Sequence, residues 1–388
     1  MRDEEIRALA QAQQAWMVSM RRKLHQIPES GFAEYKTQKV ITDALEEMGI
    51  PYTTERTWVV GVIEGALPGD TVALRADMDA LPLEEPEGLA FRSEHPGMMH
   101  ACGHDAHMTM VLGAARALAA VRDRLPGRVK LLFQPAEETV GGAEPMVRAG
   151  VMDGVKRVYG LHVQPYLPVG VIETRAGTLN ASTDEINLTI HGRASHGAYP
   201  ESGADAIVCA AQVIMSLQTL VSRNVSPLSS AVLSIGVIAG GTAGNVICDK
   251  VSLRGTLRTA NGEVRTMMKR RIEETACGVA AAMGCTAEVN IVPGYAALVN
   301  DDAEAVRVMR VGARLLGADC VVNKAAPSMG GEDFSFFCEG VPGAFFHLGC
   351  VKKENMPAPL LHSRDFRLDE DCLSVGAMMH MALVLDGQ

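Results

Sequence analysis

Apolar residues follow two alternating patterns along residues 1–180. Stretches with helical spacing, such as "EEIRALAQAQQAWMVSMRRKLHQ" and "EYKTQKVITDALEEMG", alternate with short, continuous apolar runs, such as "TVALRA" and "RVKLLFQ". Helical spacing predicts helices with one buried face, and short continuous runs predict strands that are buried on both faces. Because the two kinds of element alternate, the pattern favours an α/β sheet covered by helices.

The pattern changes between residues 181 and 292. Four strand-like runs and two long helical stretches follow one another there in the order β-α-β-β-α-β, which is typical of a ferredoxin-like unit. Alternating α/β character then returns with "DAEAVRVMRVGARLLGA". We therefore predict an α/β protein in which a ferredoxin-like domain, residues 181–292, is inserted into a larger mixed-sheet domain made of residues 1–180 and 293–388.

The bulk composition fits a soluble globular protein and excludes some partners. The 388 residues are 47% apolar and 21% charged, and their net charge is −10. The length favours two domains, and the excess of negative charge argues against a nucleic-acid partner. No apolar run reaches the roughly 18–20 residues of a membrane-spanning helix, and the charged N-terminal stretch lacks the pattern of a signal peptide. We expect no membrane contact and a cytoplasmic location.

The cysteines and the absence of common motifs narrow the chemistry further. Nine cysteines without a CxxC pair argue against a disulfide framework and against a structural zinc knuckle. Four of them lie in apolar stretches, where we expect small buried side chains: Cys209, Cys277, Cys285 and Cys320. The chain has no GxSxG, HExxH, GK[ST] or GxGxxG motif, and "AGGTAGN" is interpreted as a tight turn between strands.

Side chains that bind metals follow several predicted strands. Asp77 and Asp79 follow "TVALRA", and His162 ends "VKRVYGLHV". The stretch "HACGHDAH" places Cys102 and His104 on a loop just before a predicted helix, and "PLLHS" adds His362 late in the chain. Sites in open α/β sheets form outside the carboxyl ends of the strands, so these segments could converge.

Glu137 and Glu138 come directly after the predicted strand "RVKLLFQ". Two carboxylates beside a buried strand are costly unless a cation compensates them. Adjacent side chains point in different directions, so one carboxylate could bind a metal while the other acts as a base toward water. Mixed Cys, His and Glu ligation fits zinc, manganese, nickel or cobalt better than calcium or magnesium alone.

The order of motifs along the whole chain resembles a known family. The motifs include "LRADMDALP", "HPGMMHACGHDAHMTMVLGAA", "FQPAEE", "GLHV", "GRASHGAYP", "GGTAGNVICD", "RGTLRT", "MGGEDFSFF" and "LHS". Together they are similar to the N-acyl-amino-acid amidohydrolases, which include hippurate hydrolases, aminoacylase-like deacetylases and hydrolases of indoleacetyl–amino acid conjugates. These enzymes belong to the clan of dinuclear-metal carboxypeptidases and aminoacylases.

The resemblance implies a role for particular residues. Five of them match the family's ligands to two divalent metal ions: Cys102, His104, Glu138, His162 and His362. Glu137 matches the general base, and His196 matches a histidine that reaches the active site of a neighbouring subunit. The inserted domain is then a lid and the interface of a homodimer or larger assembly. More weakly, Asn245 and Arg258 match substrate-binding positions, and Asp79 matches a carboxylate that supports the metal site.

Some residues depart from the family's pattern or lack a function. Glu201 stands where many relatives have histidine, and Cys248 stands where proline is usual; both bear on substrate preference and not on the reaction. We expect Asp105 in the first turn of a helix, and His100 and His107 as supporting residues. The remaining histidines are expected to be structural, exposed or without an identifiable partner: His25, His95, His191, His347 and His380.

The implied reaction is hydrolysis of the amide bond of N-acyl-L-amino acids to a carboxylic acid and a free amino acid. Two other enzyme activities remain open, namely a deacetylase of the N-acetyl-diaminopimelate type and a dipeptidase. A catalytically inactive dimer that binds a small ligand is the alternative from another class. The presence of Glu137 beside a complete set of ligand candidates argues against this last alternative.

Overall fold

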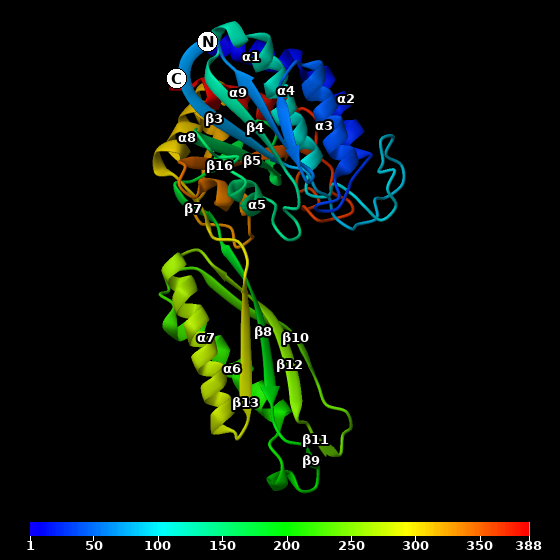
Figure 1. Cartoon of the computed structure of the whole chain (residues 1–388), viewed down its shortest axis with the longest axis vertical. Helices are drawn as coiled ribbons and strands as arrows, with labels where there is room; N and C mark the ends of the chain where they lie inside the picture. Colours follow the sequence, from blue (N-terminus) through cyan, green and yellow to red (C-terminus); the bar gives the residue numbers. More distant parts are fainter. Residues whose placement is uncertain (388) are drawn as a thin grey trace. The chain divides into compact units, whose positions relative to one another are not determined.

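The computed structural model describes residues 1–387 and divides them into two compact units, shown in Figure 1. The large unit comprises residues 1–177, 299–325 and 333–387, and the small unit comprises residues 178–298 and 326–332. The predicted insertion, residues 181–292, lies within the long segment of the small unit. The chain passes from one unit to the other in β7 (Gly177–Asn180), in β14 (Leu298–Asn300), and again after residues 325 and 332.

A mixed eight-stranded sheet forms the centre of the large unit. Its strands are, in spatial order, β1 (Tyr52–Glu55), β2 (Trp58–Glu64), β4 (Pro126–Gln134), β3 (Leu67–Asp77), β5 (Val155–Pro168), β16 (Gly343–Val351), β6 (Ile172–Thr174) and β15 (Val321–Asn323). The four central strands, from β4 to β16, are parallel, whereas β2 pairs antiparallel with β4 and β6 pairs antiparallel with β16. The predicted mixed α/β sheet is confirmed.

Helices pack around this sheet. They are α1 (Asp3–Ala12), α2 (Gln14–His25), α3 (Tyr35–Glu47), α4 (His104–Ala120), α5 (Ala143–Arg148), α8 (Asp302–Leu316) and α9 (Cys372–Leu385). Short 3-10 helices connect them at η1 (Arg122–Arg124), η3 (Ala318–Cys320), η4 (Asp333–Cys338) and η5 (Lys353–Asn355). The helical character expected for the N-terminal stretch is confirmed, and the stretch is divided into α1 and α2 at Gln13, whose N–H bonds to the carbonyl of Ala10 three residues back.

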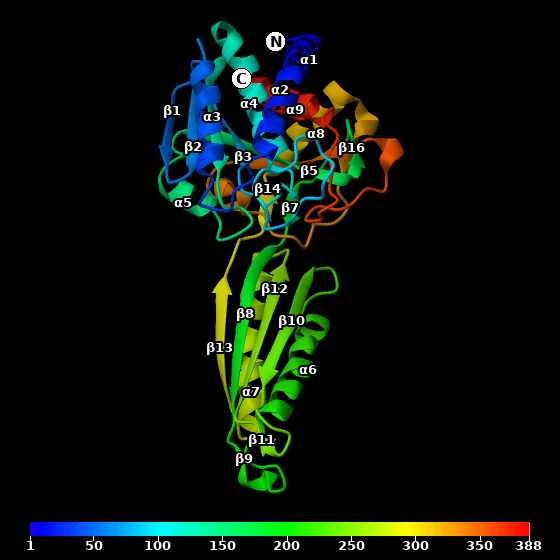
Figure 2. The ribbon, with the colours of Figure 1, turned by 90° about the vertical axis from the view of Figure 1, so that its right-hand side faces the viewer.

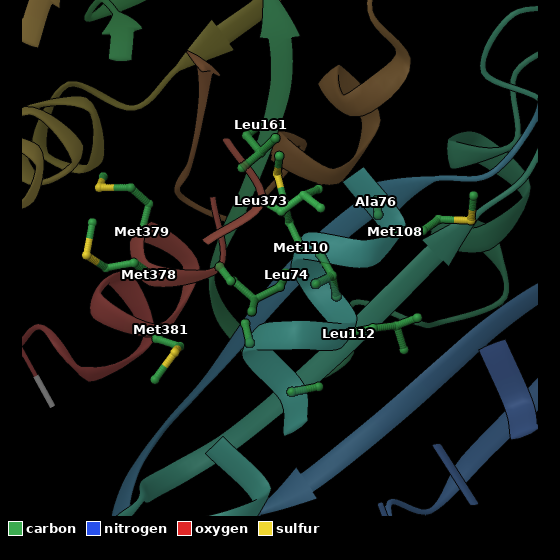
Figure 3. Close-up of a cluster of buried hydrophobic side chains, with 14 of the residues drawn as sticks. Leu74, Ala76, Met108, Met110, Leu112, Leu161, Leu373, Met378, Met379 and Met381 are labelled. Carbon is green, nitrogen blue, oxygen red and sulfur yellow. The ribbon is translucent and has the colours of Figure 1, made fainter. Parts of the chain in front are cut away.

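The core of the large unit lies around α4, which is buried on nearly all sides. Its apolar side chains continue around the whole helix and leave no polar face, as expected of a helix enclosed by other elements. Figure 3 shows Met110 of α4 among Leu74 of β3, Leu161 of β5 and Leu373 of α9. This packing fixes the first residue of α4, His104, firmly with respect to the neighbouring strands.

The small unit is an antiparallel sheet with two helices. The strand order is β10 (Ala231–Gly240), β12 (Lys250–Thr259), β8 (Ser182–His191), β13 (Thr286–Pro293), and the helices are α6 (Ala206–Asn224) and α7 (Gly262–Ala282) (Figure 2). A short ribbon of β9 (Ser195–His196) and β11 (Val246–Ile247), with η2 (Pro200–Ser202), lies at one end. The predicted ferredoxin-like order β-α-β-β-α-β is confirmed.

One helix, α6, is long and apolar enough to cross a membrane by length and composition alone, within residues 1–387. Polar residues such as Gln212, Ser216 and Gln218 interrupt it, so the expectation that no uninterrupted apolar run is that long is not contradicted. The buried side chains of α6, which include Cys209, Val213 and Leu217, belong to the core of the small unit. Its apolar composition is therefore accounted for in part by packing in the core of the small unit.

Candidate metal centre

The candidate ligands lie in the large unit, around the ends and the middle of three parallel strands. β3 ends at Asp77, which is in register with Gln134, the last residue of β4. Two residues earlier, Arg75 is in register with Gly160 of β5. The parallel register therefore brings the segments after β3 and β4 to the level of His162. β5 continues to Pro168, so His162 lies inside the strand and not at its end, as the sequence pattern had suggested.

Four of the predicted ligands lie in contact around the thiol of Cys102. The Sγ atom of Cys102 is 3.2 Å from Nε2 of His162 and 3.3 Å from Nε2 of His362. The same Nε2 of His362 is 2.9 Å from Oε1 of Glu138. Cys102 is thus common to two groups that could hold an ion, one with His104 and His162 and the other with Glu138 and His362.

His104 presents one ring nitrogen to the same place. Its Nδ1 donates a hydrogen bond to the carbonyl of Asp79 at 2.8 Å, which leaves Nε2 unprotonated in the neutral ring. Nε2 is buried, has no hydrogen-bond partner in residues 1–387, and lies 3.9 Å from Oε1 of Glu138. A buried acceptor without a partner is costly, and a cation would satisfy it.

Asp79 holds the two adjacent glutamates. Its carboxylate accepts hydrogen bonds from the backbone N–H of Glu137 at 3.1 Å and from that of Glu138 at 3.0 Å. Both glutamates are partly buried, and their carboxylates lie in one group with His104. The carboxylate of Asp79 therefore shapes the turn that carries both side chains.

In the absence of a bound cation, the pKa values of the candidate ligands are shifted in different directions. Burial raises the pKa of the Cys102 thiol well above its usual value, and the charges of Glu138 and Glu137 raise it further. Burial and the neighbouring His107 lower the pKa of His162 well below its usual value. Burial also disfavours the charged form of His104, but Asp77 and Asp79 outweigh it and raise its pKa to about 10. A bound cation would favour a thiolate and neutral imidazoles, so the donor set fits divalent metal ions.

Comparison with known proteins identifies the family. Residues 73–386 match the family model "Peptidase family M20/M25/M40". The chain belongs to this family. It is 38% identical over 379 residues to thermostable carboxypeptidase 1 of Saccharolobus solfataricus, and the aligned region covers 95% of each chain. It is 42% identical over 335 residues to the N-acetyl-L-cysteine deacetylase of Bacillus subtilis, which covers 86% of this chain and 80% of the relative.

A solved structure agrees with this assignment. A dinuclear metal-binding peptidase of family M20 from Bacillus subtilis superposes with a TM-score of 0.85 at 35% identity and covers 97% of this chain and 98% of that one. The resemblance predicted from the motifs is confirmed, and the chain is a hydrolase of the M20 family that acts on amide bonds.

A buried network that the sequence did not predict lies behind the centre of this M20 hydrolase. Asp77 accepts a hydrogen bond from Nη1 of Arg75 at 2.7 Å and contacts Nδ1 of His107 at 2.6 Å. The other ring nitrogen of His107 accepts the N–H of Val163 at 3.0 Å, so both nitrogens are occupied. Nη2 of Arg75 donates to Asp333 at 2.9 Å. His107 thus links Asp77 to the backbone of β5, and its expected role as a supporting residue stays a prediction. The only signal for Arg75 and Asp333 was a charge inside an apolar strand and an acidic pair in "GGEDF".

A second buried network surrounds His25 at the end of α2. Its Nδ1 is 2.7 Å from Asp105, and its Nε2 is 3.0 Å from Glu85. Arg21 donates to the same oxygen of Asp105 at 2.7 Å. Asp105 lies in the first turn of α4, as expected. The neighbouring His100 is buried without a partner in residues 1–387, and burial lowers its pKa to about 3.

Other residues have partners that the sequence did not reveal. His95 contacts Lys36 at 2.7 Å, and His347 contacts Glu173 at 3.0 Å. His380 is buried and His191 is half-buried.

Two of the cysteines that were expected to be buried are not. Cys277 is exposed and Cys320 is partly exposed, so the expectation of buried thiols is wrong for these two, whereas Cys209 and Cys285 are buried.

The remaining predicted site residues lie in the small unit. His196 is exposed on β9 and pairs with Val246, and the carbonyl of Asn245 accepts the N–H of Gly197 at 2.7 Å. Arg258 lies near the other end of β12, eight residues beyond Lys250, or roughly 26 Å along a strand that rises about 3.3 Å per residue. The small unit thus brings Asn245 to His196 but keeps Arg258 away from both.

Proposed function

We propose that this M20 hydrolase cleaves N-acyl-L-amino acids of the hippurate or N-acetyl type to a carboxylic acid and a free amino acid. The observation that carries the proposal is the turn with Glu137 and Glu138, which Asp79 holds through two backbone hydrogen bonds beside Cys102, His104 and His362. This arrangement provides one carboxylate to a cation and leaves its neighbour for proton transfer. The B. subtilis relative that is named a deacetylase of N-acetyl-L-cysteine belongs to the same substrate class.

Two divalent ions are the proposed cofactors. Five residues would hold them: Cys102, His104, Glu138, His162 and His362. The two groups that share Cys102 motivate the number of ions. The B. subtilis relative of known structure, which is described as a dinuclear metal-binding peptidase, also supports two ions. Zinc, manganese, nickel and cobalt all suit thiolate, imidazole and carboxylate ligands.

Glu137 carries the proton in the proposed mechanism. Bound divalent ions would lower the pKa of water to about 7 and polarise the acyl carbonyl. Glu137 accepts a proton from the attacking water and delivers it to the nitrogen of the departing amino acid. Hydrogen bonding to Asp79 restricts the backbone of Glu137, which keeps its carboxylate within reach of both atoms.

The small unit supplies the proposed dimer interface. β10 lies at the edge of the four-stranded sheet, so one side of its backbone is unpaired within the unit. Its side chains include Val237 and Ile238, which are 40% and 56% exposed. Exposed apolar edge strands pair readily with another strand, and a second copy of β10 would extend the sheet. In such a dimer, His196 of the partner subunit would donate a hydrogen bond to the developing oxyanion.

The substrate's free carboxylate needs a partner as well. Asn245 is the nearer candidate to His196, since it adjoins β9 through the bond to Gly197. Arg258 would have to act separately, because it lies near the opposite end of β12.

Metal analysis combined with a substrate panel tests the proposal. The purified protein is assayed with hippurate, N-acetyl-L-amino acids, N-acetyl-diaminopimelate, an indoleacetyl–amino acid and dipeptides. We expect the highest kcat/KM for hippurate or a simple N-acetyl amino acid, and loss of hydrolysis after chelation with recovery on adding metal. Preference for N-acetyl-diaminopimelate or for dipeptides would favour the specialised deacetylase or the dipeptidase. Binding without any turnover would favour the inactive dimer.

A mixing experiment tests the shared site. His196→Ala subunits have an intact metal centre, and Cys102→Ala subunits have an intact His196. Heterodimers of the two should regain part of the activity that each homodimer lacks. No recovery in verified heterodimers would contradict a contribution of His196 across subunits.

A further inference from the structure

The turn between β4 and the two glutamates contains an unusual backbone conformation. Ala136, directly before Glu137, has a φ of +59°, in the left-handed region that a residue with a side chain rarely adopts. Such conformations persist only when the surroundings hold them in place, and they occur often at functional sites. What holds Ala136 is therefore relevant to the direction of the Glu137 side chain.

A buried carboxylate from the start of α3 holds it. Oε1 of Glu34 accepts the backbone N–H of Ala136 at 3.0 Å, and Oε2 accepts the hydroxyl of Thr57 at 2.6 Å. Glu34 and Thr57 are both buried. Together with the two bonds to Asp79, three successive N–H groups, those of Ala136, Glu137 and Glu138, are directed at two buried carboxylates.

Glu34 does not have the usual role of an acidic residue at a helix start. It is the N-cap residue of α3, yet its side chain makes no capping hydrogen bond. The carboxylate of Glu29 caps this helix instead, since it accepts the N–H groups of Lys36 at 3.2 Å and Thr37 at 2.9 Å. Burial of Glu34 is costly, and it raises the pKa of this carboxyl to about 7 although Thr57 opposes the shift. The hydrogen bonds from Ala136 and Thr57 offset part of this cost.

The segment before Glu34 also lies against the same turn. A methyl group added to Gly31 would come within 2.9 Å of the Cα atom of Ala136 and 2.3 Å of Oγ1 of Thr139. Only glycine allows the two backbones to approach this closely. Gly31 and Glu34 thus confine the turn by shape and by hydrogen bonding.

We propose that Glu34 is a positioning residue for Glu137, because it fixes the left-handed conformation at Ala136 and so directs the general base. The proposal rests on the function proposed above, in which Glu137 transfers the proton. Glu34 does not touch the reacting atoms, and its contribution is confined to orientation. Small displacements of a catalytic group can lower turnover by about 100-fold.

The principal test compares Glu34→Ala with Glu34→Gln. The assay measures kcat, KM, bound metal and melting temperature with hippurate, or with the panel substrate hydrolysed fastest. Glu34→Ala should lower kcat per metal-loaded site by roughly 10- to 100-fold with little change in KM. Glu34→Gln retains an oxygen for the N–H of Ala136 and should keep most of the activity. Glu46→Ala is the matched control, since Glu46 is an exposed residue of the same helix that accepts the hydroxyl of Tyr52.

Two further variants cover the case in which Glu34→Ala fails to fold. Gly31→Ala should lower kcat without loss of metal, because the added methyl group displaces the turn from the other side. Ala136→Gly in the Glu34→Ala background, or in the Gly31→Ala background if the former does not fold, should recover part of the activity, because glycine adopts a positive φ without steric cost.

The outcomes separate this proposal from the function on which it rests. Three results would each overturn the positioning role. The first is full kcat in Glu34→Ala and Gly31→Ala. The others are a loss of activity that follows loss of metal, and no recovery of activity with Ala136→Gly. Glu137→Gln is assayed in parallel. If Glu137→Gln is inactive while Glu34→Ala keeps full kcat, only the positioning role fails; if Glu137→Gln is active, the proposed base itself is wrong.

Discussion

The interiors of the two units differ in kind. The large unit buries charged side chains in connected networks, such as Arg75 with Asp77 and Asp333, and His25 with Asp105 and Glu85. The core of the small unit is made of apolar side chains and three thiols, those of Cys209, Cys248 and Cys285. Its one buried aspartate, Asp184, forms ion pairs with Arg265 and Lys269. The side chains of both cations are partly exposed at the surface of the unit.

The difference indicates how the two units contribute to function. Buried charges cost free energy unless they are paired, so a unit that retains many of them is organised around a polar centre. An apolar core between helices and a sheet is sufficient for a stable scaffold. The large unit is therefore where most single substitutions should change chemistry. In the small unit, substitutions away from the proposed substrate contacts of His196, Asn245 and Arg258 should change assembly.

The largest expected effect is on the base of the large unit. Glu137→Gln should lower kcat by about 10² to 10⁴, because it removes the group that transfers the proton, while the metal content stays unchanged. Steady-state kinetics and metal analysis measure both quantities. Glu144→Gln is the control, since Glu144 is a partly exposed residue of α5 that pairs with Arg148. Activity within about tenfold of the unmodified enzyme would contradict the role of Glu137.

Breaking a buried ion pair tests the charge network itself. Arg75→Met should lower the free energy of unfolding by about 3–5 kcal/mol, because Asp77 and Asp333 would remain buried without their partner. Chemical denaturation measures the change. Arg271→Met is the matched variant in the small unit, where the pair with Glu274 is exposed, and little change is expected there. Equal losses in both variants would remove the contrast between the units.

The pH dependence of stability should reveal Glu34. Its pKa is raised to about 7 in the folded protein against 4.5 for the free side chain. The folded state therefore binds this proton more tightly, so stability is present at low pH and is lost as the pH rises through about 7. Glu34→Gln imitates the protonated form at every pH. Relative to the unmodified protein, it should gain stability by up to about 1.4 kcal/mol per pH unit within this window.

That difference is measured by denaturation of both proteins from about pH 4 to about pH 8, a range that includes both the unfolded pKa of 4.5 and the folded pKa of about 7. A constant difference across the range would mean that Glu34 is ionised in the folded protein throughout. No counterpart of this behaviour is expected from the apolar core of the small unit.

The smallest effect on stability should come from the edge strand of the small unit. Ile238→Lys places a charge on β10, where the side chain is 56% exposed, and should shift the molecular mass toward the monomer. Stability of the monomer should change by no more than about 0.5 kcal/mol. Light scattering measures the mass. Leu67→Lys, at an exposed position of the large unit, is the control, and dissociation by both variants would argue against an interface at β10.

The sequence alone determined the element types, the mixed α/β class, the inserted β-α-β-β-α-β order and the family. It did so because apolar periodicity and motif order are local properties of the chain. It also identified Cys102, His104, Glu138, His162 and His362 as ligand candidates, which the structure brings together although their roles as ligands stay a prediction.

Only the tertiary structure decided how the site is supported and how its parts are distributed. The bond from Ala136 to Glu34 joins residues 102 positions apart, and that from Arg75 to Asp333 joins residues 258 positions apart. The separation of Arg258 from Asn245 follows from the strand pairing of β12. Such contacts depend on which segments the fold brings together, and a charged residue in an apolar stretch carries no local signal that names its partner.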